Sequence, residues 1–311
     1  MPARSVGLAC TFVPDREPYF CYTTKWANDK GAAMSSWIEL KKDGPSGIEL
    51  IRAHFCGYAH AYDPHWHDDY LVGITEQGVQ QFHCRRQRHR STPGQVFLLE
   101  PGEVHDGDAP AEDGFTYQML YLNPQWLDAQ LRQLFAEVPD SFRLGFAATL
   151  SDDRLLAQAT MRAFSQLQQK GEGAMQHQFA LDSLLCGLTR HVHWRRSSPH
   201  ETSGYQARRI RDFLHANSHQ DIRMETLTAL TGLDRFRLTR LFRQTYGLPP
   251  HAYLVQLRLT QARRLLASGA KPIAVAAQLG FADQSHLGRW FQRAYRLTPA
   301  HYRKLCTNLP D

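Results

Sequence analysis

Three histidines stand where they could bind a metal ion or a small polar molecule. His65 and His67 are two residues apart, so on a strand their side chains point to one face. The later segment Pro101-Gly102-Glu103-Val104-His105 supplies a third imidazole. Three protein ligands with one open position are typical of catalytic zinc sites. The pattern therefore allows a metal centre, a polar ligand pocket, or a structural role in which the imidazoles hold strands together by hydrogen bonds.

The spacing of these histidines is similar to that of a cupin barrel. A metal-dependent cupin usually adds a glutamate soon after the histidine pair, whereas here Asp68-Asp69-Tyr70 follows and no glutamate occurs before Glu76. We therefore expect no metal and no cofactor, and a pocket for a small-molecule effector inside the barrel. The residues expected to line this pocket are His65, Trp66, His67, Tyr70, His105, Tyr117 and Tyr121.

A second set of informative residues lies in an internal repeat near the C-terminus. Each copy is predicted to be a short helix, a glycine turn at Gly232 or Gly280, and a longer helix, which is the helix-turn-helix that presents a helix to the DNA major groove. Seven residues recur 49 positions later: Leu238, Arg240, Phe242, Tyr246, Leu248, Pro250 and Tyr253 match Leu287, Arg289, Phe291, Tyr295, Leu297, Pro299 and Tyr302.

The longer helix of each copy has an apolar face for the core and a polar face. Arginine and glutamine suit bidentate contacts with guanine and adenine edges, and the alternative is an ordinary solvated face. Arg237 and Arg293 are better placed for phosphates. The helix expected at His251–Ser268 lies between the two copies and is about 27 Å long. This length suits two DNA-reading helices, or readers, placed about one DNA turn apart. The outward residues are Phe236, Arg240, Arg243, Ser285, Arg289 and Gln292.

Charge supports a polyanion partner for this region. Residues 204–311 hold 17 Lys and Arg against 6 Asp and Glu, a net charge of +11, while the whole chain carries +6. A basic domain joined to a mildly acidic one is typical of a DNA-binding protein with a second task.

Residues 205–305 resemble the DNA-binding domain of the AraC/XylS family. The similarity rests on Gly280-Phe281-Ala282-Asp283-Gln284-Ser285-His286-Leu287, continued by Arg289, Phe291, Pro299 and Tyr302-Arg303. It implies seven helices with readers at 234–246 and 283–295. Gly288 stands where a polar residue is often found, so the second reader is expected to contact fewer bases. The resemblance implies these base-side residues: Phe236, Thr239, Arg240, Gln284, Ser285, His286 and Arg289.

Residues 54–122 resemble the cupin-like sensor of the same family, through His65, His67-Asp68-Asp69-Tyr70, Gly94 and the segment ending at His105. The predicted fold class is α+β, with an N-terminal cupin-like barrel and helical hairpin and a C-terminal all-α double helix-turn-helix domain. The strands expected are Ile48–Phe55, Tyr70–Ile74, Val79–Cys84, Val96–Leu99 and Phe115–Leu122, and the helices that follow are Pro124–Phe135, Asp152–Gln169 and Ala174–Arg195.

Five regions follow along the chain. We expect an N-terminal extension at 1–47 that is disordered in part, a ligand-binding domain at 48–150, a helical hairpin for dimerisation at 151–195, a linker at 196–204 and the DNA-binding domain at 205–305. No apolar run is long enough to span a membrane and no secretion signal opens the chain. The six cysteines are scattered. A location in the bacterial cytosol, with the nucleoid, is therefore expected.

The predicted function is a sequence-specific, DNA-binding transcription regulator, not an enzyme, controlled by a small-molecule effector that shifts populations between conformations. The expected partners are double-stranded DNA, the effector, a second copy of the chain and RNA polymerase. Two alternatives stay open: a metal-dependent cupin enzyme with a DNA-binding tail, and a DNA-bound regulator whose barrel only dimerises.

Overall fold

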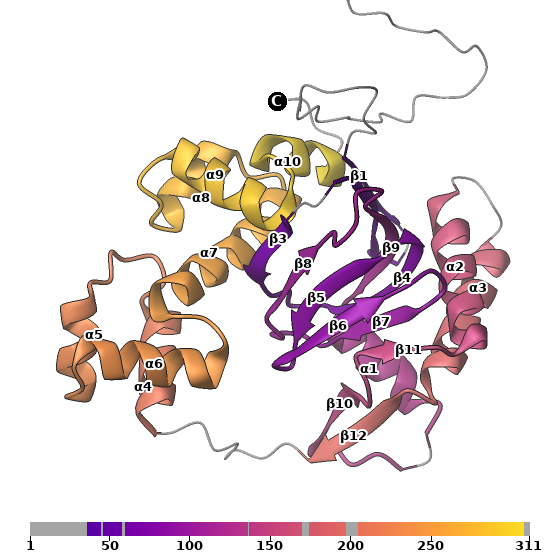
Figure 1. The fold of residues 1–311 in the computed structure, drawn as a ribbon, viewed down its shortest axis with the longest axis horizontal. Helices are drawn as coiled ribbons and strands as arrows, with labels where there is room; N and C mark the ends of the chain where they lie inside the picture. Colours follow the sequence, from indigo (N-terminus) through magenta and orange to yellow (C-terminus); the bar gives the residue numbers. More distant parts are fainter. Residues whose placement is uncertain are drawn as a thin grey trace, which may run out of the picture.

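The computed structural model describes residues 36–44, 46–57, 60–135, 137–169, 174–196 and 205–307 (Figure 1). Residues 1–35 of the expected extension and 197–204 of the expected linker lie outside the described residues. A β-rich N-terminal domain and a helical C-terminal domain confirm the predicted α+β class. Within the described residues, no helix has the length and apolar character to cross a membrane.

Two antiparallel sheets face each other in the N-terminal domain and form an open, cupin-like barrel. Side chains from both sheets, including Phe82, Phe97 and Tyr117, fill the space between them. The six-stranded sheet has the order β1 (Trp37–Lys42), β2 (Glu49–Phe55), β9 (Phe115–Leu122), β4 (Tyr70–Gly78), β7 (Val96–Leu99) and β11 (Leu150–Ser151). The four-stranded sheet has the order β3 (His60–His65), β8 (His105–Asp108), β5 (Gln80–Cys84) and β6 (Gln87–Ser91).

Strand alternation separates two cores. On β4, Leu71 points between the sheets, whereas Tyr70 and Val72 point to the outer face of the six-stranded sheet. That outer face is covered by α1 (Pro124–Arg132), α2 (Arg154–Gln168) and α3 (Ala174–Leu188). Figure 1 shows the α2–α3 hairpin and the C-terminal domain on opposite sides of the barrel.

The predicted helix Ala174–Arg195 is wrong beyond Leu188. Strand β12 (Val192–Arg196) follows and pairs with β10 (Phe142–Phe146). Its apolar residues Val192 and Trp194 alternate with polar ones and pack on the core, which is a strand period rather than a helical one. Strand β1 lies inside the segment expected as an extension, where it pairs with β2.

Residues 205–307 form seven helices, as the resemblance implies. Gly232 and Gly280 adopt left-handed φ angles of 70° and 73° after the short helices, a conformation that glycine accepts at low cost. Helix α7 connects the two halves and contributes to both of their cores. The helices are α4 (Tyr205–Ala216), α5 (Met224–Thr231), α6 (Arg235–Tyr246), α7 (Pro250–Ala267), α8 (Pro272–Gln278), α9 (Gln284–Tyr295) and α10 (Pro299–Thr307).

Candidate nucleic-acid interface and effector cavity

Helix α6 presents a basic face with one exposed aromatic ring. The Asp234 carboxylate accepts hydrogen bonds from the backbone N–H groups of Phe236 and Arg237, which starts the helix at a defined residue. Leu238 and Phe242 are fully buried, which fixes the rotation of the helix. The side chain of Phe236 is 71% exposed as a consequence. Arg237, Arg240 and Arg243 are also exposed, and Thr239 is half-buried.

Helix α9 repeats this arrangement. Leu287 and Phe291 are fully buried, so the predicted residues Gln284, Ser285 and Arg289 face solvent. A Cβ added at Gly288 would meet no atom within 4 Å, so the surface of the second reader is open at this position.

Two of the predicted DNA-facing residues have other contacts, and a third is half-buried. The ring of His286 accepts a hydrogen bond from the indole N–H of Trp290 at 2.9 Å and is half-buried. Gln292 is half-buried. The guanidinium of Arg293 forms an ion pair with Asp63 of the barrel at 2.7 Å. In this conformation Arg293 is therefore paired with the barrel, and a phosphate would have to compete with Asp63 for its exposed guanidinium.

A cavity lies between the two sheets, and the C-terminal domain forms part of its wall. The cavity is small: the space that the centre of a water-sized sphere can occupy is about 40 Å³. Five of the predicted pocket residues line it: His65, His67, His105, Tyr117 and Tyr121. The C-terminal domain contributes Arg263, Ala294, Tyr295, Leu297 and Tyr302.

The structure places Trp66 and Tyr70 outside the cavity, which corrects their prediction as pocket residues. Trp66 packs against the ring of Tyr253 with 4.7 Å between ring centroids, so it joins the two domains. The hydroxyl of Tyr70 donates to the backbone oxygen of Leu144 at 2.7 Å in the outer core. Both side chains alternate away from the interior-facing residues beside them.

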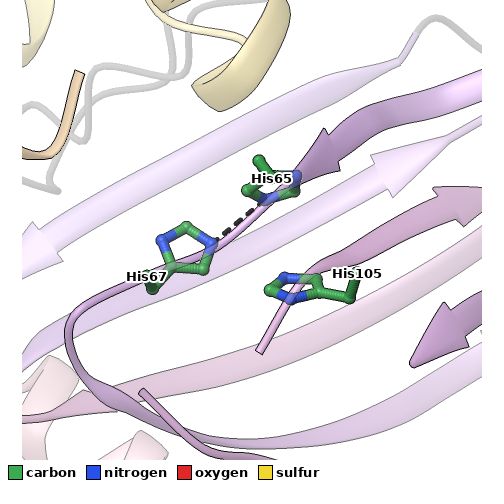
Figure 2. A group of neighbouring side chains, drawn as sticks. All are labelled: His65, His67 and His105. Atoms are coloured by element: carbon green, nitrogen blue, oxygen red, sulfur yellow. Dashed lines mark hydrogen bonds between the residues drawn. The ribbon is translucent and has the colours of Figure 1, made fainter. Parts of the chain in front are cut away.

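The three histidines line the cavity and lie close to one another (Figure 2). The Nε2 atoms of His65 and His67 are 3.1 Å apart, and each of the three rings offers a nitrogen within 4.8 Å of the other two. The Nδ1 atom of His65 lies 2.7 Å from the oxygen of Asp63, and Nδ1 of His105 lies 2.9 Å from the oxygen of Glu103. Since carbonyls only accept hydrogen bonds, both Nδ1 atoms carry the proton and both Nε2 atoms keep a lone pair.

All three histidines are neutral near pH 7. Burial first, and the neighbouring ring of His105 second, lower the pKa of His65 to about 3, against the opposing effect of the hydrogen bond to the Asp63 carbonyl. Burial also lowers the pKa values of His67 and His105. Neutral imidazoles are the form that binds metals.

Arg263 of α7, which lines the cavity, forms an ion pair with Glu49 of β2. The two side chains are 11% and 13% exposed and lie 2.5 Å apart, and the hydroxyl of Tyr302 donates to the other carboxylate oxygen at 2.9 Å. The guanidinium of Arg263 also lies 4.9 Å from the ring centroid of Tyr121 and 5.1 Å from that of Tyr295. We name this group, Glu49, Arg263 and Tyr302, the interdomain clasp.

Sequence reasoning missed the interdomain clasp. One local feature could have indicated it: the charged Arg263 follows the buried Ala262 in a helix that we interpreted only as a spacer. Its partner Glu49 is 214 residues away in the chain, so local patterns carried no information about it. Further polar contacts join the domains at Arg264 with Asp68 and at Arg296 with the oxygen of Ala61.

Comparisons with known proteins agree with this arrangement. The family described as AraC-like ligand binding domain matches residues 46–188, and the one described as helix-turn-helix domain matches residues 227–305. The chain is 28% identical over 245 residues to the arabinose operon regulatory protein of Escherichia coli strain K12, covering 75% of this chain and 77% of that protein. It is 27% identical over 251 residues to the uncharacterised HTH-type transcriptional regulator YbfI of Bacillus subtilis, covering 80% and 88%.

Among solved structures, an apo variant of ToxT from Vibrio cholerae shares the fold, with a TM-score of 0.53 at 13% identity, covering 86% of this chain and all of that one. The two family models thus match an N-terminal ligand-binding domain followed by a C-terminal helix-turn-helix domain. The chain therefore joins an AraC-like ligand-binding domain to a helix-turn-helix domain and is an AraC-type, DNA-binding transcription regulator.

Proposed function

We propose that the effector binds in the cavity between the two domains and that the docked conformation described above binds DNA weakly. The observation that carries this proposal is the composition of the cavity wall, since Arg263, Tyr295 and Tyr302 of the DNA-binding domain close a cavity that otherwise belongs to the barrel. A molecule in the cavity therefore contacts the DNA-binding domain directly.

The size of the cavity requires movement. With about 40 Å³ open to the centre of a water-sized sphere, the cavity holds no more than a few waters. A metabolite needs several hundred Å³ of pocket volume. The barrel wall is a hydrogen-bonded sheet, whereas the wall made by α7, α9 and α10 is held by side-chain contacts. Displacement of the DNA-binding domain is therefore the way in which this cavity enlarges.

The lining favours an effector with an apolar body and a polar or anionic head. Phe82, Phe97 and Met119 supply apolar and aromatic surface. The hydroxyls of Tyr62 and Tyr117, 2.5 Å apart, and the guanidinium of Arg263 are the polar groups that such a head would meet.

The docked conformation also restrains the readers. Arg293 of α9 is paired with Asp63, so the barrel competes with a phosphate for this side chain. An effector that separates the domains would release Arg293 and allow α6 and α9 to adjust to the spacing of the DNA grooves. Binding would thus shift a population rather than create a new fold.

We further propose a homodimer through the α2–α3 hairpin. Phe179 is 61% exposed and shares one stripe of α3 with Met175, and Leu155 of α2 is exposed as well. The hairpin that carries these exposed side chains lies on the opposite side of the barrel from the DNA-binding domain (Figure 1). The dimer would act on promoter DNA in the bacterial cytosol and contact RNA polymerase there. The barrel would sense and not catalyse, as the regulators related to this chain suggest.

A thermal-shift screen of the full-length chain against sugars, amino acids and aromatic acids tests the effector site. A compound that raises the melting temperature should also change the affinity for DNA selected by the protein from a random pool. Tyr117→Phe removes a hydroxyl that lines the cavity and should alter the compound's affinity. Tyr70→Phe removes a hydroxyl from the outer core and is the matched control. Equal effects of the two substitutions, or stabilisation without any change in DNA binding, would contradict the proposal.

A further inference from the structure

We infer that His65, His67 and His105 form a binding site for one divalent transition-metal ion of the Zn²⁺ class, and that the bound ion loosens the interdomain clasp. The missing glutamate led us to expect no metal, but the arrangement of the three rings points the other way. The ion site stands on its geometry alone, whereas its effect on DNA binding rests on the proposed function.

The distances suit a tetrahedral ion. Ligand nitrogens about 2.0–2.1 Å from zinc in a tetrahedron lie roughly 3.4 Å from one another. The Nε2 atoms of His65 and His67 already lie 3.1 Å apart, and the ligand atom of His105 is within 4.8 Å of both. A small rotation of one ring completes three corners. The fourth corner opens into the cavity that these histidines line.

The rings are prepared as ligands. Backbone oxygens of Asp63 and Glu103 hold Nδ1 of His65 and His105, so their Nε2 lone pairs face inward. A hydrogen bond from the second nitrogen to a carbonyl is the usual way in which metal-binding histidines are oriented. Because Nδ1 carries the proton in both rings, no proton has to be displaced from their Nε2 atoms before an ion binds.

The charge around the site favours an anion in the fourth position. The carboxylate of Asp106, which also lines the cavity, is engaged by the backbone N–H and the ring of His83. Three neutral ligands leave the ion with its full charge of +2, close to the guanidinium of Arg263. A carboxylate or another anionic head of the effector would neutralise part of this charge, so ion and effector are expected to bind cooperatively.

His67 connects the ion to the interdomain clasp. Its Nδ1 lies 3.4 Å from Nη1 of Arg263. Because a guanidinium only donates, Nδ1 accepts and the ring proton sits on Nε2, directed at Nε2 of His65. An ion at Nε2 of His67 moves this proton to Nδ1, where it faces Arg263 as a second donor. The hydrogen bond is lost, and the positive ion repels the guanidinium.

Zinc titration of the purified, chelator-treated full-length chain tests the site. We expect one equivalent of Zn²⁺ per chain, and a visible absorption spectrum of four-coordinate Co²⁺ when cobalt replaces zinc. His105→Gln keeps a polar side chain of similar size and should weaken binding at least about 100-fold. His251→Ala removes an exposed histidine at the start of α7, outside the cluster, and should leave the stoichiometry unchanged.

Two results would overturn the site. One is the absence of stoichiometric zinc or of a four-coordinate cobalt spectrum in the wild-type chain, a reading that does not depend on the folding of any variant. The other is equal binding by His105→Gln and wild type, which would assign the zinc to surface histidines.

A DNA-affinity measurement with and without zinc tests the coupling separately. Loss of one hydrogen bond at the interdomain clasp should raise the affinity of the wild-type chain for selected DNA roughly two- to tenfold. His105→Gln should still bind DNA but should no longer respond to zinc. Stoichiometric zinc without any effect on DNA affinity would overturn the regulatory part and favour an enzymatic barrel. Failure of the chain to bind DNA at all would instead refute the proposed function.

Discussion

Replacement of Glu49 by glutamine should release the DNA-binding domain from the barrel. The substitution removes the negative charge beside Arg263 and keeps an amide of similar size that still accepts the hydroxyl of Tyr302. Breaking a buried ion pair costs about 3–5 kcal/mol, because the remaining charge has no partner. The retained amide favours the low end, so about 3 kcal/mol is expected. The cost falls on the docked conformation alone, since Arg263 becomes solvated when the domains separate.

A destabilisation of about 3 kcal/mol shifts the docking equilibrium roughly 100-fold. Apparent DNA affinity scales with the fraction of molecules that are competent to bind, so it should rise by up to that factor. Fluorescence anisotropy with DNA selected by the wild-type protein measures the affinity. Small-angle X-ray scattering of the free protein should show a larger radius of gyration for Glu49→Gln.

Glu76→Gln is the matched control, because Glu76 forms a 2.8 Å ion pair with Arg52 within the barrel and away from the second domain. It should change neither the radius of gyration nor the DNA affinity. If Glu49→Gln expands the protein and the DNA affinity stays within about twofold of wild type or falls, docking does not restrain DNA binding and the reasoning is refuted.

Four further predictions concern single side chains. Arg240→Ala should cost about 1–3 kcal/mol of DNA binding and relax base choice at one position of the site, as measured by selection from a random pool. Arg293→Ala should weaken binding on all sequences alike and reduce the slope of affinity against salt by about one, since we assign Arg293 to a phosphate once Asp63 releases it. Gly288→Ala should stabilise the protein by roughly 0.5–1 kcal/mol in denaturant unfolding, because the helix gains alanine's propensity and the added Cβ meets open space. Asp153→Ala should destabilise it by about 1 kcal/mol near pH 7, because the carboxylate caps α2, and a hydrogen bond from His191 lowers the carboxyl pKa. That difference from wild type should be present above the ordinary pKa of an aspartate and should vanish as the pH falls through the lowered folded-state pKa.

Arg154→Ala serves as the control for both arginine substitutions, because Arg154 is exposed on α2 in the other domain and should leave DNA binding unchanged. A uniform loss of affinity for Arg240→Ala would reassign this residue to a phosphate. A sequence-dependent loss for Arg293→Ala would assign it to a base. Destabilisation by Gly288→Ala, or a pH-independent effect of Asp153→Ala, would contradict the helix and capping arguments respectively.

The DNA-binding domain was predictable because the sequence patterns that determine its helices are local and occur twice. The repeated spacing of Leu238, Phe242 and their counterparts determines which side of each long helix is buried, and the exposed Arg240 and Arg289 follow from that rotation. The glycine turns are equally local, since only their position after a short helix matters.

The contacts between the domains were not predictable in this way. The alternation that directs His65 and His67 inward directs Trp66 outward, yet its partner Tyr253 is known only once the domains are placed together. The short strand at Val192 was missed because its pairing with β10 spans about 50 residues of sequence and the preceding helix has a strong apolar pattern. Long-range pairing decides such segments, and local propensity does not.

Hydroxyl-radical footprinting of the full-length chain on its selected DNA tests the central claim most directly. If α6 and α9 are paired readers held by α7, each chain should protect two windows on one face of the duplex, with centres about 10–10.5 base pairs apart. Arg240→Ala should weaken one window and Arg289→Ala the other. A single short window per chain, or two windows that both substitutions weaken equally, would contradict this account.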